Sequence, residues 1–456
     1  MKSPRPPAKR RPGPPPHARK DAPKPPTVQS DNPEAGGLDA RRAALDLVAS
    51  ALDHRGELEE AFAREPFAAL ELRDRALARM MAMTQLRRLG EIDRLLDAKM
   101  SKPPPEAVRA LLRLGVAQLF HMDIPAFAAV DTTVRLAEAG EATRPFKGLI
   151  NAVLRGLQRD QKPEFDPEVL APGWLFARWR AAYGEAAARA IATMIAEEPL
   201  TDLSLRDADN AAALAEALEA QPLAGGSLRS QKRGDVADWP GYAEGGWWVQ
   251  DAAAAIPARL LAVKPGETAI DLCAAPGGKT LQLAAAGAKV TALDRSAQRL
   301  RRVTQSLERT GLTAEVVAAE AERWEVGRQF DAVLLDAPCS ATGTFRRHPD
   351  VLWGTRPGDI AKLASVQARL LDSAAARVRP GGRLVYCVCS LESEEGEAQA
   401  EAFLARHKDF TLAPVAPGEA GAPEGSVTDG GLLRILPHQL KGGADGFFAA
   451  RFLRRT

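Results

Sequence analysis

Apolar residues recur at helical spacing in the first third of this chain. Between Ala44 and Leu52, and again between Leu111 and Phe120, they return every three or four positions, which places them on one face of a helix. Three consecutive prolines at 103–105 interrupt the pattern before the second of these segments. Because patterns typical of strands are scarce here, we predict that residues 37–160 form an all-α bundle.

From Trp247 onward, short apolar runs alternate with helical segments. The runs predict strands at residues 268–272, 289–294, 331–336, 383–390 and 446–453. This alternation favours a mostly parallel α/β sheet with right-handed crossovers. We therefore predict an α/β domain over residues 246–456, with a Pro/Gly-rich surface loop at 413–425. Residues 161–245 would connect the two domains through helices and loops.

Residues 1–36 differ in composition from the rest of the chain. They begin MKSPRPPAKRRPGPPPHARK and are rich in proline and basic side chains. Such a segment cannot bury an apolar core, so we predict a disordered basic tail. Its cations could replace the counterions of a nucleic acid in a weak contact, and a tail that only aids solubility is the alternative.

Composition restricts the kind of protein further. Lys plus Arg number 61 and Asp plus Glu number 59, so the formal net charge is +2 and the whole chain is not a polycation. No run approaches the roughly 18 apolar residues of a membrane helix, and the N-terminus lacks the apolar segment of a secretory signal. Four cysteines in 456 residues cannot form a disulfide scaffold, so we predict a cytoplasmic protein.

A glycine-rich turn follows the strand predicted at 268–272. It consists of Cys273, Ala274, Ala275, Pro276, Gly277, Gly278 and Lys279, and a helix opens after it. Glycines let backbone N–H groups approach a ligand at the N-terminus of the helix. A phosphate-binding loop of the Walker type would need glycine at position 273. An adenosine-type cofactor instead requires an acid at the end of the next strand to bind the ribose hydroxyls, where this chain has Asp294. A turn that merely packs is the remaining alternative.

Cysteines lie beside the ends of two further predicted strands, at the edge where open α/β sheets form active sites. Asp336 and Cys339 follow one strand, and Cys389 lies at the end of the other. A zinc site would need four ligands with paired spacing, which Cys387 and Cys389 do not provide, so we predict no metal. The two sulfurs are therefore candidate nucleophiles.

Thiolate chemistry suits a nucleic-acid base. Carbon 5 of cytosine is a poor nucleophile until a thiolate adds at carbon 6, which creates an enamine that can attack a methyl sulfonium. A proton must then leave carbon 5 so that the thiolate can be expelled. Asp336 could bind the N3/N4 edge of the cytosine. The residues that could hold RNA phosphates are Arg346, Arg347 and His348.

Three segments, DLCAAPGGKT, DAPCSATGTFRRHPD and YCVCS, resemble the Sun-type RNA (cytosine-5)-methyltransferases. The likeness extends to WVQD at 248–251 and GGADGFF at 442–448. The helical half, through FKGLINAVLR at 146–155, resembles the NusB-like RNA-binding domain fused to the bacterial enzymes of this family that modify small-subunit ribosomal RNA. Together the two likenesses cover most of residues 38–456.

The resemblance implies a role for each matching residue. Cys389 would be the nucleophile, and Cys339 would assist proton removal and product release. The segment from Cys273 to Lys279 would hold S-adenosylmethionine (SAM), with Asp294 on its ribose, Asp336 near its reactive end and Glu320 on its adenine side. The family usually has aspartate at position 320 and threonine at position 388, where this chain has glutamate and valine. Cys387 receives no role, and we expect it in the core.

The resemblance thus implies an N-terminal NusB-like all-α bundle followed by a Rossmann-like α/β domain. The implied activity is SAM-dependent methylation of carbon 5 of a cytosine in RNA, most simply small-subunit (16S) ribosomal RNA. RNA is the expected partner, and no obligate protein partner is inferred. Transfer RNA as substrate, a catalytically inert RNA-binding assembly factor and a phosphate-loop ATPase are the alternatives.

Overall fold

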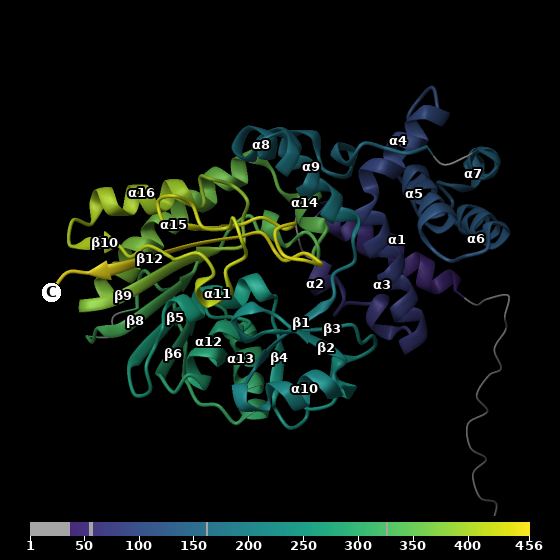
Figure 1. The fold of residues 1–456 in the computed structure, drawn as a ribbon. Coiled ribbons are helices and arrows are strands. Elements are labelled where there is room, and N and C mark those ends of the chain that lie inside the picture. The colour runs from purple at the N-terminus through teal and green to yellow at the C-terminus, as the bar shows by residue number, and fades with distance from the viewer. Residues whose placement is uncertain (1–36, 54–57, 161–162, 325–326) are drawn as a thin grey trace, which may run out of the picture. The chain divides into compact units, whose positions relative to one another are not determined.

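The computed structural model describes residues 37–53, 58–160, 163–324 and 327–456 (Figure 1). The tail at 1–36, for which we predict disorder, lies outside the described residues. Within the described ranges, no helix combines the length and the apolar character needed to cross a membrane.

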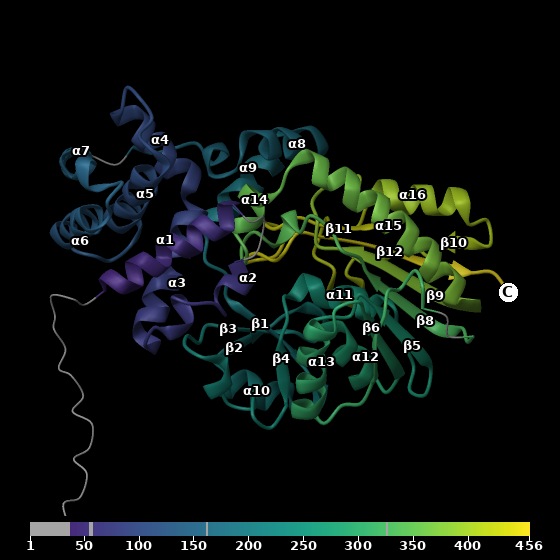
Figure 2. The same cartoon turned by 180° about the vertical axis from the view of Figure 1, so that it is seen from behind.

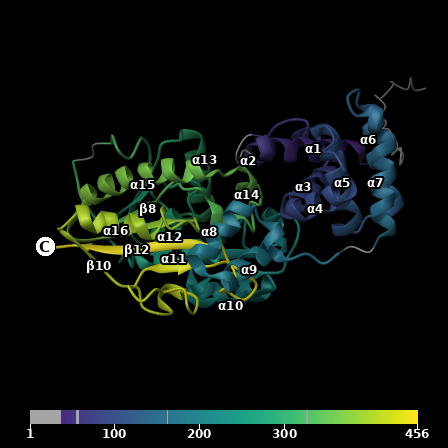
Figure 3. The same ribbon diagram turned by 90° about the horizontal axis from the view of Figure 1, so that it is seen from above.

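The described part of residues 38–159 is built from helices (Figure 3). They are α1 (Leu38–Asp53), α2 (Leu58–Ala61), α3 (Leu72–Arg87), α4 (Leu89–Lys99), α5 (Glu106–His121), α6 (Ala126–Ala139) and α7 (Lys147–Arg159). Helix α1 packs on α3, and α5 packs on α3, α6 and α7. Pro105 and Pro125 lie immediately before α5 and α6, where a missing N–H removes no helical hydrogen bond. The predicted all-α domain is confirmed.

A small antiparallel sheet that we did not predict has three strands in the predicted connecting segment 161–245 and its fourth strand just inside the predicted α/β domain. Helices α8 (Gly173–Tyr183) and α9 (Glu185–Thr193) precede it, and α10 (Ala211–Ala217) lies between its first two strands. The strands are β1 (Thr201–Leu205), β2 (Ala220–Pro222), β3 (Leu228–Ser230) and β4 (Trp247–Val249), in the order β2-β3-β1-β4. Strands of three to five residues are too short to show a clear alternation of apolar and polar side chains, which is why their pattern does not predict them.

The α/β domain contains a mixed sheet of order β10-β12-β9-β8-β5-β6-β7, with β11 paired to β12. Its strands are β5 (Thr268–Leu272), β6 (Lys289–Asp294), β7 (Glu315–Ala318), β8 (Phe330–Asp336), β9 (Val378–Val388), β10 (Phe410–Leu412), β11 (Leu433–Ile435) and β12 (Phe447–Arg454). Strands β7, β6, β5, β8 and β9 pair in parallel, whereas β12 is antiparallel to β9 and β10. The predicted α/β fold is confirmed.

Helices cover both faces of this sheet (Figures 1 and 2). They are α11 (Ala252–Leu260), α12 (Gly278–Ala285), α13 (Ala297–Thr310), α15 (Pro357–Arg377) and α16 (Glu397–Arg406), whereas the short helix α14 (Asp350–Gly354) packs against α1. Helices α11, α12 and α13 lie on one face, and α15 and α16 lie on the other (Figures 1 and 2). Both faces of the central strands are therefore buried, as expected for parallel strands.

The strand ends define one edge of the sheet. The predicted strands at 268–272 and 289–294 coincide with β5 and β6. Strand β9 ends at Val388, so Cys389 lies in the segment just beyond it. Because β5, β6, β8 and β9 run in the same direction, the residues that follow them all emerge at the same edge.

The core of the helical domain provides a test of this packing. Leu154 of α7 is fully buried, and its side chain lies against Gly115 of α5. We expect Leu154→Ala to lower the free energy of unfolding by about 2–5 kcal/mol, because it leaves a cavity. Leu149→Ala on the same helix should change it by less than about 0.5 kcal/mol, since Leu149 is 40 % exposed. Urea unfolding followed by circular dichroism measures both, and equal effects would contradict the packing.

Candidate active site

Two thiols meet at the edge of the sheet where β8 and β9 end. The strands pair with Asp336 opposite Cys387, so the segments that follow them start side by side. Cys339 and Cys389, which belong to these two segments, have their Sγ atoms 3.5 Å apart. The backbone N–H of Gly343 donates to the carbonyl oxygen of Cys389 at 3.0 Å, which ties the two segments together. The structure thus brings the two predicted catalytic cysteines into contact.

Three of the four cysteines have surroundings that favour the neutral thiol. Burial raises the pKa of Cys273 to about 12 and the pKa of Cys387 well above its usual range. The hydrogen bond with Cys389, together with burial, raises the pKa of Cys339 well above its usual range. Because the thiolate is the reactive form, these three side chains are poorly suited to begin a covalent reaction.

Asp336, the last residue of β8, forms an ion pair at the same edge of the sheet. The Nζ atom of Lys279 is 2.7 Å from Oδ2 of Asp336. Burial, the largest single influence, would lower the pKa of Lys279, but the charge and hydrogen bond of Asp336 together with the other neighbouring groups outweigh it, so the pKa is raised overall and the ammonium group is retained. The other carboxylate oxygen of Asp336 accepts a hydrogen bond from Cys387 at 3.4 Å. Cys387 is fully buried, as expected, and Asp336 is held from two sides.

The glycine-rich turn has the geometry of a ligand loop. Gly277, with φ of +110°, lies in the left-handed region, and a Cβ atom there would lie 3.2 Å from the side chain of Val303. The backbone N–H of Ala275 donates to Oδ2 of Asp294 at 3.2 Å, and that of Ser296 donates to Oδ1 at 2.9 Å. Backbone N–H groups and the Arg299 guanidinium, 3.6 Å away, therefore hold the buried carboxylate at the end of β6, and its position beside the glycine-rich turn fits an adenosine cofactor with a ribose diol.

Glu320 lies near Asp294, at the end of the neighbouring strand β7. The backbone N–H of Ala319 donates to the carbonyl oxygen of Asp294 at 3.1 Å, which places residue 320 at the same edge of the sheet. The Glu320 carboxylate is exposed and forms an ion pair with Arg323 at 3.0 Å. Its position is compatible with the predicted contact to the adenine side of the cofactor.

The basic segment after Cys339 divides into buried and accessible residues. Arg346 is only 2 % exposed, and its guanidinium donates to the carbonyl oxygen of Gly442 at 2.7 Å. Arg346 is therefore part of the protein framework, and the predicted phosphate contact is corrected for this residue. Arg347 and His348 are half-buried. Arg347 forms an ion pair with the buried carboxylate of Asp445, with Nε 3.1 Å from Oδ2.

The positive charge of Arg347 also interacts with Cys389. Burial would lower the pKa of Arg347, but Asp445 outweighs this effect and the pKa is raised overall. The same guanidinium interacts electrostatically with Asp251 and Cys389. A fixed cation thus lies close to the predicted nucleophile.

Sequence reasoning missed a set of buried charged residues that hold the loop after Cys389. Glu395, which is fully buried, accepts hydrogen bonds from Ser340 and Ser390. Arg434 of β11 donates to the carbonyl oxygen of Ser390 at 2.5 Å and pairs with Glu397 at 2.7 Å. One signal of this set is visible in the sequence, namely the acidic run LESEEGE that directly follows Ser390.

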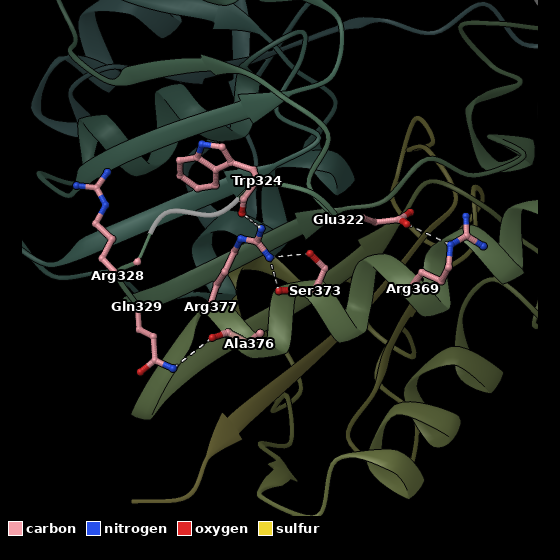
Figure 4. A pocket seen from close by; sticks show the side chains of 9 residues that line it. Glu322, Trp324, Arg328, Gln329, Arg369, Ser373, Ala376 and Arg377 are labelled. Carbon is pink, nitrogen blue, oxygen red and sulfur yellow. Dashed lines mark hydrogen bonds and ion pairs between the residues drawn. The ribbon is translucent and has the colours of Figure 1, made fainter.

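A cavity of about 540 Å³ lies away from the cysteines, beside the amino end of β8 and the second half of α15 (Figure 4). Within it, Arg369 pairs with Glu322, and Arg377 donates to the carbonyl oxygen of Trp324 (Figure 4). Arg377 also donates to the carbonyl oxygen of Ala321. Its cations are engaged in contacts within the protein, so this cavity is not the candidate active site.

Two family models match the chain. Residues 258–453 match the model described as 16S rRNA methyltransferase RsmB/F, and residues 38–159 match the model of the NusB family. Ribosomal RNA small subunit methyltransferase B of Pseudomonas syringae pv. tomato is 37 % identical over 441 residues, which cover 91 % of this chain and 97 % of that protein. The protein of the same name from Vibrio cholerae is 36 % identical over 88 % of this chain and 98 % of its own length.

Solved structures show the same architecture. PH0851 superposes with a TM-score of 0.72 at 25 % identity and covers 93 % of this chain and 99 % of its own. NSun6 from Pyrococcus horikoshii with SFG has the same fold, with a TM-score of 0.53 at 20 % identity over 62 % of this chain and 98 % of that one.

Fold and site together define an RNA methyltransferase that uses SAM. The chain belongs to the RsmB/F family and carries a NusB-family domain at its N-terminal side.

The buried Asp271 predicts a pH dependence of stability. Burial raises its pKa to about 7, although Thr280 donates to its carboxylate at 2.6 Å. The folded state therefore binds a proton more tightly than the unfolded chain between pH 4 and 7, and stability falls as the pH rises through that range. Asp271→Asn removes this fall, so its change in unfolding free energy between pH 5 and 8 should be smaller by up to about 2.7 kcal/mol.

Asp331→Asn is the matched control, measured in the same urea titrations at the two pH values. Hydrogen bonds from Thr268 lower the pKa of Asp331 to about 2. Its carboxylate is ionised throughout pH 5–8, so the wild-type difference between the two pH values should persist in this variant. An Asp271→Asn protein that also kept the full difference would contradict the assignment.

Proposed function

We propose that this protein methylates carbon 5 of a cytosine in 16S ribosomal RNA, through a covalent bond between Cys389 and carbon 6. The observation that carries the proposal is the contact of two thiols at the edge of a methyltransferase sheet, with Sγ atoms 3.5 Å apart. The curated relatives, which match over most of their length, are named as small-subunit ribosomal RNA methyltransferases, which supports the choice of substrate.

We propose a separate role in RNA methylation for each domain. Residues 37–160 would bind RNA as a NusB-like domain, residues 161–245 would connect, and residues 246–456 would carry out catalysis in the cytoplasm. Phosphate contacts made by the helical domain would supply affinity, whereas the catalytic pocket would supply base identity. Arg347 and His348 remain the residues that we propose for phosphate contacts near the target base.

The chemistry begins with addition of the Cys389 thiolate to carbon 6. The S–C6 bond forms, and the electrons of the C5–C6 double bond become available at carbon 5. SAM, when held by residues 273–279, Asp294 and Glu320, supplies the electrophilic methyl group.

Asp336 and Cys339 serve the remaining steps. Lys279 and Cys387 fix the Asp336 carboxylate, so that it can bind the N3/N4 edge of the base and stabilise charge there. After methylation, a base, either water or the Cys339 thiolate, takes the proton from carbon 5. The electrons of the C5–H bond then form the C5–C6 double bond, and those of the S–C6 bond return to sulfur as the Cys389 thiolate leaves. Cys339 lies next to the sulfur that must leave, and we assign it to this release.

Methyl transfer from labelled SAM to two unmodified RNAs, 16S ribosomal RNA and bulk transfer RNA, tests the function. We expect label in the ribosomal RNA, and bisulfite sequencing should then show one protected cytosine. Label in transfer RNA alone would support the proposed methyl transfer but contradict 16S ribosomal RNA as the substrate. RNA binding without transfer, on free RNA and on an assembling particle, would favour an inert assembly factor.

The two thiols have separable roles. Cys389→Ser should abolish transfer, because a hydroxyl is too weak a nucleophile near neutral pH. Cys339→Ala should instead accumulate protein covalently bound to RNA, because release is impaired. Denaturing gel electrophoresis after incubation with RNA and SAM distinguishes these results. A trapped complex with the Cys389 variant, and none with the Cys339 variant, would reverse the assignment.

A further inference from the structure

The two reacting thiols belong to separate segments of the chain. Cys339 and Cys389 lie 50 residues apart in sequence, and free thiols do not join the segments covalently. Each cysteine is followed directly by a serine, Ser340 in one segment and Ser390 in the other. A group that held both serines would therefore set the distance between the two sulfurs.

Glu395 is such a group. Its carboxylate accepts four hydrogen bonds from described residues, two at each oxygen. Oε1 accepts from the backbone N–H of Ser340 at 2.9 Å and from Gln367 at 3.0 Å. Oε2 accepts from the hydroxyl of Ser390 at 2.5 Å and from the hydroxyl of Ser340. One carboxylate thus connects the residues that follow the two cysteines.

The carboxylate is itself held in place. Glu395 is fully buried, so solvent does not compete for its hydrogen bonds. The hydroxyl of Tyr386 in β9 donates to the backbone carbonyl of Glu395 at 2.5 Å. Gln367, which belongs to α15, also donates to the carbonyl oxygen of Pro338 at 2.9 Å, next to Cys339. Strand, helix and both cysteine segments therefore converge on this side chain.

We propose that Glu395 is a positioning residue, which fixes the separation of the Cys339 and Cys389 sulfurs and thereby the rate of the chemical step. Its catalytic consequence rests on the proposed function, whereas the separation of the sulfurs depends only on this chain's own side chains. A displacement of about 1 Å at reacting groups can cost on the order of 10²-fold in rate. Glu395 contacts neither substrate nor cofactor in this scheme and acts only through the two serines.

Three substitutions at Glu395 distinguish a positioning role from an effect of its charge alone. Glu395→Asp keeps the charge but withdraws the carboxylate by one methylene, so it cannot reach both serines. Glu395→Ala removes the carboxylate and leaves the segments joined by the Gly343–Cys389 backbone bond and the direct contact of the Ser340 and Ser390 hydroxyls, whose oxygens lie 3.1 Å apart. Glu395→Gln keeps the length, and because serine hydroxyls can accept as well as donate, it can retain the connection without the charge. We expect kcat to fall about 10²-fold in the Asp and Ala variants, with KM for RNA and SAM little changed, and to be largely retained in the Gln variant.

Glu394→Gln is the matched control. It removes the neighbouring carboxylate, which is 47 % exposed and bonded to Arg178 rather than to either serine. This variant should keep the wild-type kcat. Where Glu395→Ala does not fold, Ser340→Ala and Ser390→Ala each remove one hydroxyl donor and should lower kcat in the same direction.

The separation of the sulfurs is measured without RNA. Dibromobimane becomes fluorescent when it bridges two thiols, so the wild-type protein should give a signal that Cys389→Ser abolishes. The Asp and Ala variants should lose most of this signal while SAM binding, measured by calorimetry, persists. The Gln and Glu394 variants should keep it.

The two readouts separate the two hypotheses. Loss of both kcat and bridging in the Asp and Ala variants supports the positioning role. Full bridging with lost turnover, or unchanged turnover in Glu395→Ala, overturns it. If the wild-type protein methylated neither RNA, the proposed function would fail, and the bridging comparison would still decide whether Glu395 sets the separation of the thiols.

Discussion

The parallel register between β8 and β9 is the constraint on which the active site depends. With Asp336 opposite Cys387, the two strands end at the same level and the cysteine segments leave the sheet side by side. A slip of one residue would turn every side chain of one strand to the opposite face. Both faces of these strands are covered by helices, so such a slip would bury the wrong side chains on both sides. The apolar core thus fixes where the two cysteine segments begin, and polar contacts beyond the strand ends hold the thiols themselves.

Ion pairs hold the loops that follow the strands of the sheet. Asp202 pairs with Arg229 at 2.6 Å, and Arg434 pairs with Glu397 at 2.7 Å. Such pairs add little net stability, because desolvation offsets much of the attraction, but loss of one partner costs about 3–5 kcal/mol. In this protein these ion pairs connect specific segments of the chain. Arg229 donates to the carbonyl oxygens of Lys441 and Gly443, so it joins the small antiparallel sheet to the loop that also contains Asp445, the partner of Arg347.

The sequence predicted those features that depend on local pattern. Strands β5 and β6 were found because buried parallel strands form continuous apolar runs. The convergence of Asp336, Cys339 and Cys389 followed from the rule that parallel strands end at one edge. By contrast, Glu395 bonds partners 55 and 28 residues away, and Arg346 is buried by the distant loop around Gly442. Neither relation leaves a local signature, since each is created by tertiary packing.

Position 388 shows that the residue before the nucleophile can vary when other contacts hold the nucleophile in place. The family usually has threonine there, and this chain has valine. Val388 is the last residue of β9, pairs with Phe448 of β12 and is fully buried in the apolar core of the sheet. A hydroxyl at this depth would need a buried partner, because an unpaired one is costly. Cys389 is instead held through its own carbonyl oxygen, which accepts from Gly343, and through Ser390, which is bound by Glu395 and Arg434. Valine is therefore compatible with the site, because the contacts that place the nucleophile lie after it in the chain and not before it.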